Sequence, residues 1–240
     1  MKRTRYILPT AIAVTAIGLV AGGVMGGISG SKHDFADPVR YPTNWSNGQI
    51  CLPCHAPHNT TPTATDGGEL AGPLWNHTLS TNSYKMYTAV LNDPNDVTKG
   101  THEGVTDGNK VDTNSVLCLS CHDGTIALDS FGGATSTTAG AITGRANLGT
   151  DLSNDHPIGA AAEWKEVPYM VSKTLRATAG IMPLRKMDNG VEVVGCTSCH
   201  EPHNRKSTKF MLWVDNDKPG TTVAGTSVSG SVLCLNCHKK

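Results

Sequence analysis

The longest hydrophobic run in the chain lies near its amino terminus. Residues 6–24 are mostly apolar, basic residues occupy three of the first five positions, and small residues follow the run. This order is typical of an export signal, predicted here as residues 1–29 with cleavage near residues 27–31. The alternative is an uncleaved membrane anchor, since about 20 apolar residues can span a bilayer. Pro9 and the glycines disfavour a stable membrane helix, so we expect cleavage.

Beyond residue 30 the pattern of polar and apolar positions predicts few long elements. Residues 125–150 are rich in Gly, Thr, Ser and Ala, which favours turns and short strands over a helix. The helix candidates are short: single turns around four cysteine pairs, and a stretch near Ala160–Glu166. We therefore predict sparse regular structure.

The composition suggests that something other than side chains fills the interior. Hydrophobic residues make up 38% of the chain and aromatic residues only 5%, while there are 26 glycines and 13 prolines. The alternative is a disordered surface protein, but the order of the cysteines argues against it. Removal of the signal leaves 17 basic against 20 acidic residues. This mildly acidic balance, without a basic patch, gives no indication of nucleic-acid binding.

All eight cysteines belong to four Cys-x-x-Cys-His motifs. Chance would give on the order of 0.01 such motifs in a chain of this composition. Zinc binding and disulfide bonding are the alternatives, but neither requires a histidine at the same offset four times. The residues of the four motifs are Cys51, Cys54 and His55; Cys118, Cys121 and His122; Cys196, Cys199 and His200; and Cys234, Cys237 and His238.

The spacing within these motifs matches covalent attachment of c-type haem. Two thiols separated by two residues can form thioethers to the two vinyl groups of one haem, and the next residue then ligates the iron. We therefore predict four covalently bound haems, with all eight cysteines as attachment points. The predicted proximal ligands are His55, His122, His200 and His238.

Six further histidines exceed the four distal ligands that six-coordinate irons would need. This surplus favours bis-histidine ligation over methionine, which would raise the reduction potential. His58 and His203 each follow a proximal histidine by three residues, in Cys-His-x-Pro-His-Asn. Residues three apart project to similar sides of a helical turn. We therefore expect each to ligate an adjacent haem, which would bring the two porphyrins close together.

Three more histidines are candidate distal ligands. His156 follows an aspartate that can orient its ring, and His33 lies just after the expected cleavage site. His77 follows Trp75, which can pack on a porphyrin. His102 lies in a polar stretch, and we expect it to be solvated.

The motifs alternate between two types, in the order A-B-A-B. The first and third share Cys-x-x-Cys-His-x-Pro-His-Asn, and the second and fourth share Ser-Val-Leu-Cys-Leu-x-Cys-His. This alternation predicts a duplicated two-haem module within a domain of residues 30–240, with halves near 31–125 and 190–240. The alternative is convergence of short motifs, which the extra matching residues disfavour.

Several of these stretches together resemble the filament-forming extracellular tetrahaem cytochromes of the OmcE type. They are His33-Asp34-Phe35, Cys51 to Asn59, Pro73 to His77, Cys118 to Thr125, Asp155-His156-Pro157, Cys196 to Asn204, and Cys234 to His238. The resemblance implies a multihaem cytochrome c fold, with short helices and turns wrapped around a chain of four haems. It also implies a homopolymer in which a histidine of one subunit ligates a haem of the next. Either His33 or His77 is left as the fourth distal ligand, and the ligand that crosses between subunits is left open between them. His33 is the more attractive for the crossing, because an amino-terminal arm can reach a neighbouring subunit.

The function expected is electron transfer through four bis-histidine haems. The resemblance favours a secreted filament subunit at or outside the cell surface, passing electrons to redox proteins or an extracellular acceptor. A monomeric periplasmic shuttle is the alternative, and the residues alone do not separate the two. We do not expect an enzyme, because all four motifs end in histidine and further histidines are plentiful. No stable membrane span is expected after signal cleavage.

Overall fold

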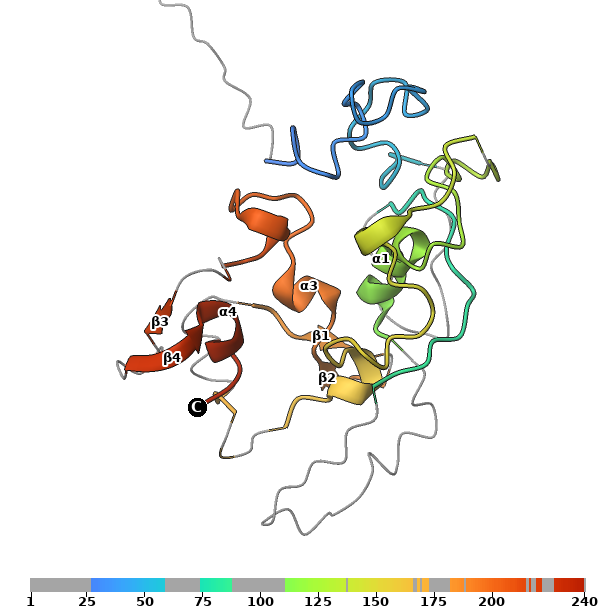
Figure 1. The fold of residues 1–240 in the computed structure, drawn as a ribbon. Helices are drawn as coiled ribbons and strands as arrows, with labels where there is room; N and C mark the ends of the chain where they lie inside the picture. The colour runs from blue at the N-terminus through green and yellow to red at the C-terminus, as the bar shows by residue number, and fades with distance from the viewer. Residues whose placement is uncertain are drawn as a thin grey trace, which may run out of the picture.

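Regular secondary structure is short and sparse along the chain. In this computed structural model, α1 (Thr113–His122) is the longest helix among the residues that the structure describes. Those residues are 27–58, 74–87, 111–136, 138–165, 168, 170–172, 182–187, 189–214, 216, 219–221 and 227–239. The other elements are η1 (Gly144–Ala146), η2 (Gly159–Ala162), β1 (Arg185–Lys186), β2 (Glu192–Val193), α3 (Cys196–Cys199), η3 (Lys209–Met211), β3 (Pro219–Thr221), β4 (Ser227–Ser231) and α4 (Val232–Leu235). Figure 1 shows these elements joined by long irregular segments.

Helix α1 has well-defined capping at both ends. The Asp112 carboxylate accepts the Ser115 amide at 3.1 Å and so satisfies one of the amides that a helix start leaves unpaired. At the other end Gly124 adopts a φ of +72°, a conformation that suits glycine, and its amide donates to the Cys121 carbonyl. The cap holds the second motif, which forms the last turn of the helix.

Helices α1 and α3 begin side by side, as Figure 1 shows. The Ser115 hydroxyl donates to Asp112 and accepts the Cys196 amide at 2.9 Å. A β-carbon on Gly195 would meet an Asp112 carboxylate oxygen at only 2.4 Å, so this close approach requires glycine. The starts of the second and third motifs are therefore joined by one buried hydrogen-bonded cluster.

The apolar core is small. Tyr84, Met86, Leu119 and Leu152 form a buried cluster, flanked by partly buried Val111, Ile158 and Ala161. The Tyr84 hydroxyl lies 2.9 Å from an Asp123 carboxylate oxygen, which holds the segment around residue 84 against the second motif. Short helices, paired strands of two to five residues and a small core are compatible with the predicted multihaem fold.

The strands form two small antiparallel pairs. Arg185 pairs with Val193 in the β1–β2 ladder, and Pro219 pairs with Ser231 in the β3–β4 ladder. The second ladder contacts α4, so the fourth motif follows directly from a strand. Short ladders of this kind position the motif turns without forming a sheet core.

Outside these elements, the predicted turns and short strands of 125–150 appear as an isolated bridge between Ala127 and Ala141 and as η1. The helix expected near Ala160–Glu166 is only the 3₁₀ turn η2, because Glu163 leaves the turn to form a bridge with Val193. Glu166 lies outside the described residues.

Most of the predicted signal, residues 1–26, also lies outside the described part of the chain, as does His102. Within the described ranges, none of the helices has the length and hydropathy needed to cross a bilayer.

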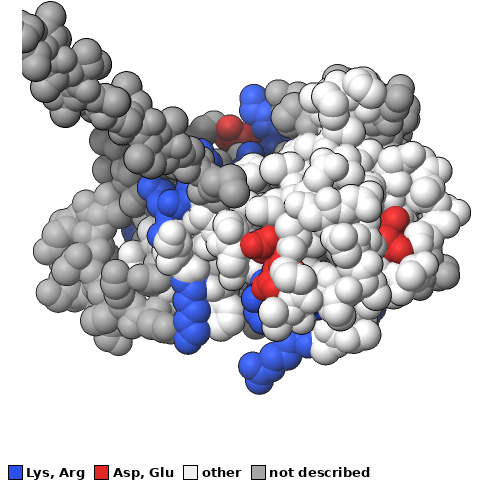
Figure 2. Space-filling view, turned by 90° about the horizontal axis from the view of Figure 1, so that it is seen from above, with Lys and Arg blue, Asp and Glu red and all other residues white. Residues whose placement is uncertain are grey.

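Charged side chains are thinly spread over the face in Figure 2. Basic and acidic residues are interspersed there, and most of the described surface carries neither. The exposed Lys85–Asp151 ion pair, at 2.9 Å, is solvated on both sides. Solvent screens such exposed pairs, so they contribute little to stability. The fold therefore depends on capped turns, buried polar clusters and the small core.

Candidate functional site

Each motif forms a helical turn that brings its thiols and its histidine together. The second motif lies within α1. In the other three, the histidine amide donates to the carbonyl of the first cysteine: His55 to Cys51 at 2.8 Å, His200 to Cys196 at 3.0 Å and His238 to Cys234 at 2.9 Å. Residues three and four apart lie on one side of such a turn. The local structure therefore places both thiols and the ring on one side, as attachment to a single haem requires.

Three of the four predicted proximal histidines lie beside a second histidine from a distant part of the chain. The ring centroids are separated by 6.2 Å for His55 and His203, 6.0 Å for His122 and His33, and 6.3 Å for His238 and His156. The structure thus brings together three of the predicted proximal ligands with three of the predicted distal ligands.

These separations fit a metal ion held between two imidazoles. Imidazole nitrogen binds a metal at about 2 Å, so rings on opposite sides of one ion have centroids about 6 Å apart. Within the described ranges, no group of three or more His, Cys, Asp or Glu side chains could hold a metal by itself. Two imidazoles fit haem iron, because the porphyrin supplies the other four ligands. None of the eight cysteines forms a disulfide.

Backbone carbonyls orient four of the candidate rings. The Nδ1 atoms of His33, His122, His156 and His200 lie near carbonyl oxygens of Pro202 (3.4 Å), Ala146 (2.8 Å), Pro157 (2.9 Å) and Phe210 (3.0 Å). A ring that donates through Nδ1 keeps the lone pair of Nε2 for a metal. Each of these histidines is thus held in the tautomer that ligation requires.

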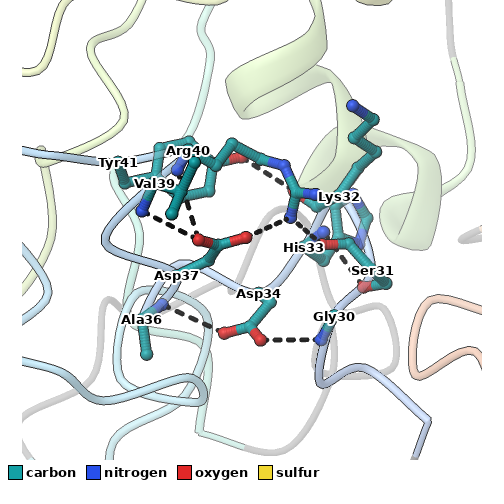
Figure 3. A network of polar contacts seen from close by, with 10 residues as sticks. All are labelled: Gly30, Ser31, Lys32, His33, Asp34, Ala36, Asp37, Val39, Arg40 and Tyr41. Carbon is teal, nitrogen blue, oxygen red and sulfur yellow. Dashed lines mark hydrogen bonds and ion pairs between the residues drawn. The ribbon is translucent and has the colours of Figure 1, made fainter.

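His33 is held by the amino-terminal segment drawn in Figure 3. Asp34 accepts the amides of Gly30 at 2.7 Å and Ala36 at 3.2 Å, and the His33 amide donates to the Ser31 hydroxyl at 3.1 Å. Burial, followed by the charge of nearby His122, lowers the pKa of His33 to about 4. The ring is therefore neutral at physiological pH, as a metal ligand must be.

His77 is placed differently from the other candidates. It is 1% exposed, and its two ring nitrogens lie 2.9 Å from the Thr78 carbonyl and 3.2 Å from the Ala127 carbonyl. Its Nε2 is also 3.5 Å from the Cys121 sulfur. Burial lowers the pKa of His77, and the carbonyl contacts oppose this shift. The structure brings His77 beside a predicted haem attachment point, but not beside a predicted proximal histidine.

His200 and His58 lie on the surface. Both side chains are exposed. Among the described residues, neither has another imidazole in ring contact. Within the described ranges, His200 is therefore the one predicted proximal ligand whose ring has no second imidazole of the same chain beside it.

Cysteines of different motifs meet inside the molecule. A hydrogen bond between the Cys118 and Cys196 thiols, aided by burial, holds the pKa of Cys118 well above its ordinary value, and the same bond lowers that of Cys196. Burial raises the pKa of Cys54 to about 12. Burial and then the charge of Cys54 raise the pKa of Cys121. The second motif thus adjoins both the first and the third.

The sequence pattern alone does not single out Glu201, which lies between His200 and His203. Burial alone would raise its pKa, but the amides of Arg205 and His203 and the Arg205 guanidinium outweigh burial and lower the pKa. The only sequence indication was that the third motif has glutamate where the first has Ala56. Ala146 and Phe210 orient the rings of His122 and His200 through their backbone carbonyls. Their side chains take no part in these contacts, so the sequence does not reveal this role.

The comparison with protein families agrees with this chemistry over part of the chain. The doubled CXXCH motif family matches residues 189–240, which hold the third and fourth motifs. No match was found among curated proteins. The family match indicates a region like those of multihaem c-type cytochromes, with covalently bound c-type haem and a role in electron transfer.

Proposed function

We propose that the whole chain carries four bis-histidine c-type haems and serves as the subunit of an extracellular filament for long-range electron transport. The three histidine pairs at about 6 Å support the proposal most directly. A bound haem would supply one-electron chemistry at its iron, and the protein would supply ligation, spacing and electrostatic surroundings.

The first element of the proposal is ligation within the chain. His55 and His203, His122 and His33, and His238 and His156 would each supply both axial imidazoles of one iron. With both axial positions occupied by protein, these sites are suited to electron transfer and leave no position for a substrate. We therefore propose no catalytic role.

The second element is the connection between sites. His203 pairs with His55, while His200, three positions earlier, belongs to the third motif. One short segment would thus serve two sites, in line with the expectation from the sequence for His203. The thiol contact between Cys118 and Cys196 joins the second and third motifs in the same way. Close attachment points favour close porphyrin edges, which fast electron transfer requires.

The third element is continuation into another copy of the chain. Among the described residues, His200 offers a ring on the surface without a second imidazole in contact, and His58 offers an exposed ring elsewhere. We propose that His58 of one copy completes the site at His200 of the next. His33 and His77 are less suited to this role, because His33 faces His122 and both His77 nitrogens face carbonyls.

A contact between two different surface sites of identical chains is heterologous. Such contacts build rings when the rotation closes and open filaments when it does not. Filament growth by this route would extend the row of sites from one subunit to the next. Secretion to the cell surface or beyond follows from the expected export signal and completes the proposal.

The proposal is tested by electron microscopy of secreted protein from wild type and from the His58→Ala variant. We expect filaments from wild type, and from His58→Ala only single subunits that still carry four haems by intact mass. His102→Ala is the matched control and should still form filaments. Strictly monomeric wild-type protein at all concentrations would overturn the filament proposal and favour a monomeric shuttle. Normal His58→Ala filaments would overturn the linking role of His58.

A second readout separates ligation from assembly. Loss of His58 should leave one iron per chain with an open position, so added imidazole should restore its low-spin spectrum. Imidazole cannot bridge two subunits, so filaments should stay absent. Recovery of filaments with imidazole would show that His58 does not link the copies.

A further inference from the structure

Glu201 is a buried carboxylate within the third motif. Its side chain is 1% exposed, and it accepts the backbone amides of His203 at 3.2 Å and Arg205 at 2.5 Å. The Arg205 guanidinium Nε lies 3.3 Å from the same carboxylate. These donors fix the carboxylate in place and stabilise its charge.

The fixed carboxylate also faces a predicted iron ligand. An oxygen of Glu201 lies 3.4 Å from Nδ1 of His203, and His203 is paired with His55. The Nδ1 atoms of His33, His122, His156 and His200 face neutral backbone carbonyls instead. Among these five rings, His203 is thus the one that faces a full negative charge.

We propose that Glu201 is a positioning residue that orients His203 and lowers the reduction potential of the haem attached at the first motif. The inference rests on the proposed ligation of that iron by His203. A carboxylate that accepts the Nδ1 proton makes the imidazole a stronger donor at Nε2. Stronger donation favours ferric over ferrous iron, and burial keeps the carboxylate's field from being screened by water.

Arg205 opposes this effect only in part. Its side chain is 62% exposed, so solvent screens its charge, whereas Glu201 is enclosed. Removal of the arginine charge should therefore move the same potential in the opposite direction to removal of the glutamate charge. The same geometry therefore predicts potential shifts of opposite sign for a Glu201 variant and an Arg205 variant.

The test is a spectroelectrochemical titration of the intact haem-loaded protein. In Glu201→Gln we expect one of the four midpoint potentials to become more positive while the other three stay in place. Glu163→Gln removes an equal charge from an exposed ion pair with Lys165 and should leave all four unchanged. The inference is overturned if Glu201→Gln retains four low-spin haems and all four potentials.

Arg205→Gln keeps the inference testable if Glu201→Gln does not fold. We expect it to make the same single potential more negative, and an unchanged or more positive value counts against the inference. In a His203→Ala background, Glu201→Gln should shift the potential of that haem less than it does in the presence of His203. Failure of the proposed function would be seen separately, as wild-type protein that lacks a haem between His55 and His203.

Discussion

The imidazole rings of His55 and His203 lie 6.2 Å apart and within 22° of parallel, although one ring belongs to the first motif and the other follows the third. This separation matches two ligands on opposite sides of one iron. The pair brings two distant Cys-x-x-Cys-His segments together. The proposed electron transfer therefore depends on ligands that are exchanged between motifs.

Loss of His203 should open one iron. In His203→Ala we expect one haem per chain to become high-spin and, when reduced, to bind carbon monoxide, because a small side chain leaves the axial position empty. His102→Ala is the control and should remain low-spin. Absorption spectra with and without carbon monoxide provide the measurement. A fully low-spin His203→Ala protein that ignores carbon monoxide would show that another group ligates this iron.

Each motif should contribute one haem to the mass of the mature protein. Four covalent haems add about 2.5 kDa in total, so the loss of one should remove roughly a quarter of that increment. We expect the variant with Cys118→Ala and Cys121→Ala to lose one haem by intact mass spectrometry under denaturing conditions. An increment of only two haems in wild type would restrict attachment to residues 189–240, where the family match lies.

The part of the site encoded locally could be predicted from the sequence. The spacing of each motif dictates a helical turn with the thiols and the ring on one side, and all four motifs form such turns. The pairing of His55 with His203, one of the exchanges expected between motifs, appears in the structure. Two of the expected helix turns, α3 and α4, span only four residues each.

Long-range contacts were harder to predict. Nothing local links His33 to His122, because their approach depends on how the amino-terminal segment lies against Pro202. The orientation of the rings by backbone carbonyls could not be predicted from the sequence either, because every residue has a carbonyl. The burial of His77 and the contacts of its ring with two carbonyls likewise depend on tertiary packing.

The stability of the protein should depend on pH through Asp112. Burial raises the pKa of its carboxyl, and the hydrogen bonds from Ser115 offset this only in part. The folded state thus binds the proton more tightly than the unfolded state. This contribution to stability is fully present below the unfolded pKa of about 3.9 and is lost as pH rises through the higher folded pKa.

Asp112→Asn isolates this contribution because the amide can still cap α1 but carries no charge. We expect the free energy of unfolding of wild type relative to Asp112→Asn to fall as pH rises from 4 to 7, as measured by urea titration at each pH. Asp112→Ala removes the cap as well and should be less stable than Asp112→Asn by about 1 kcal/mol at every pH. A flat difference between wild type and Asp112→Asn would contradict the assigned pKa shift.

Close packing between α1 and α3 should make Gly195 intolerant of substitution. A β-carbon there would lie 2.4 Å from an Asp112 oxygen, so we expect Gly195→Ala to destabilise the protein by about 1–3 kcal/mol. Because the clash is with a side chain, Asp112→Ala should relieve most of it, and the two changes should be strongly non-additive. Additive losses in thermal unfolding would indicate that the helix starts do not touch.

Cryo-electron microscopy of the native secreted protein tests the central claim most directly. We expect four haems per chain, with irons between His55 and His203, between His122 and His33, and between His238 and His156. The fourth iron should lie between His200 and His58 of the adjacent subunit. A map in which the members of any of the three in-chain pairs ligate different irons, or in which a motif holds no haem, would contradict the account.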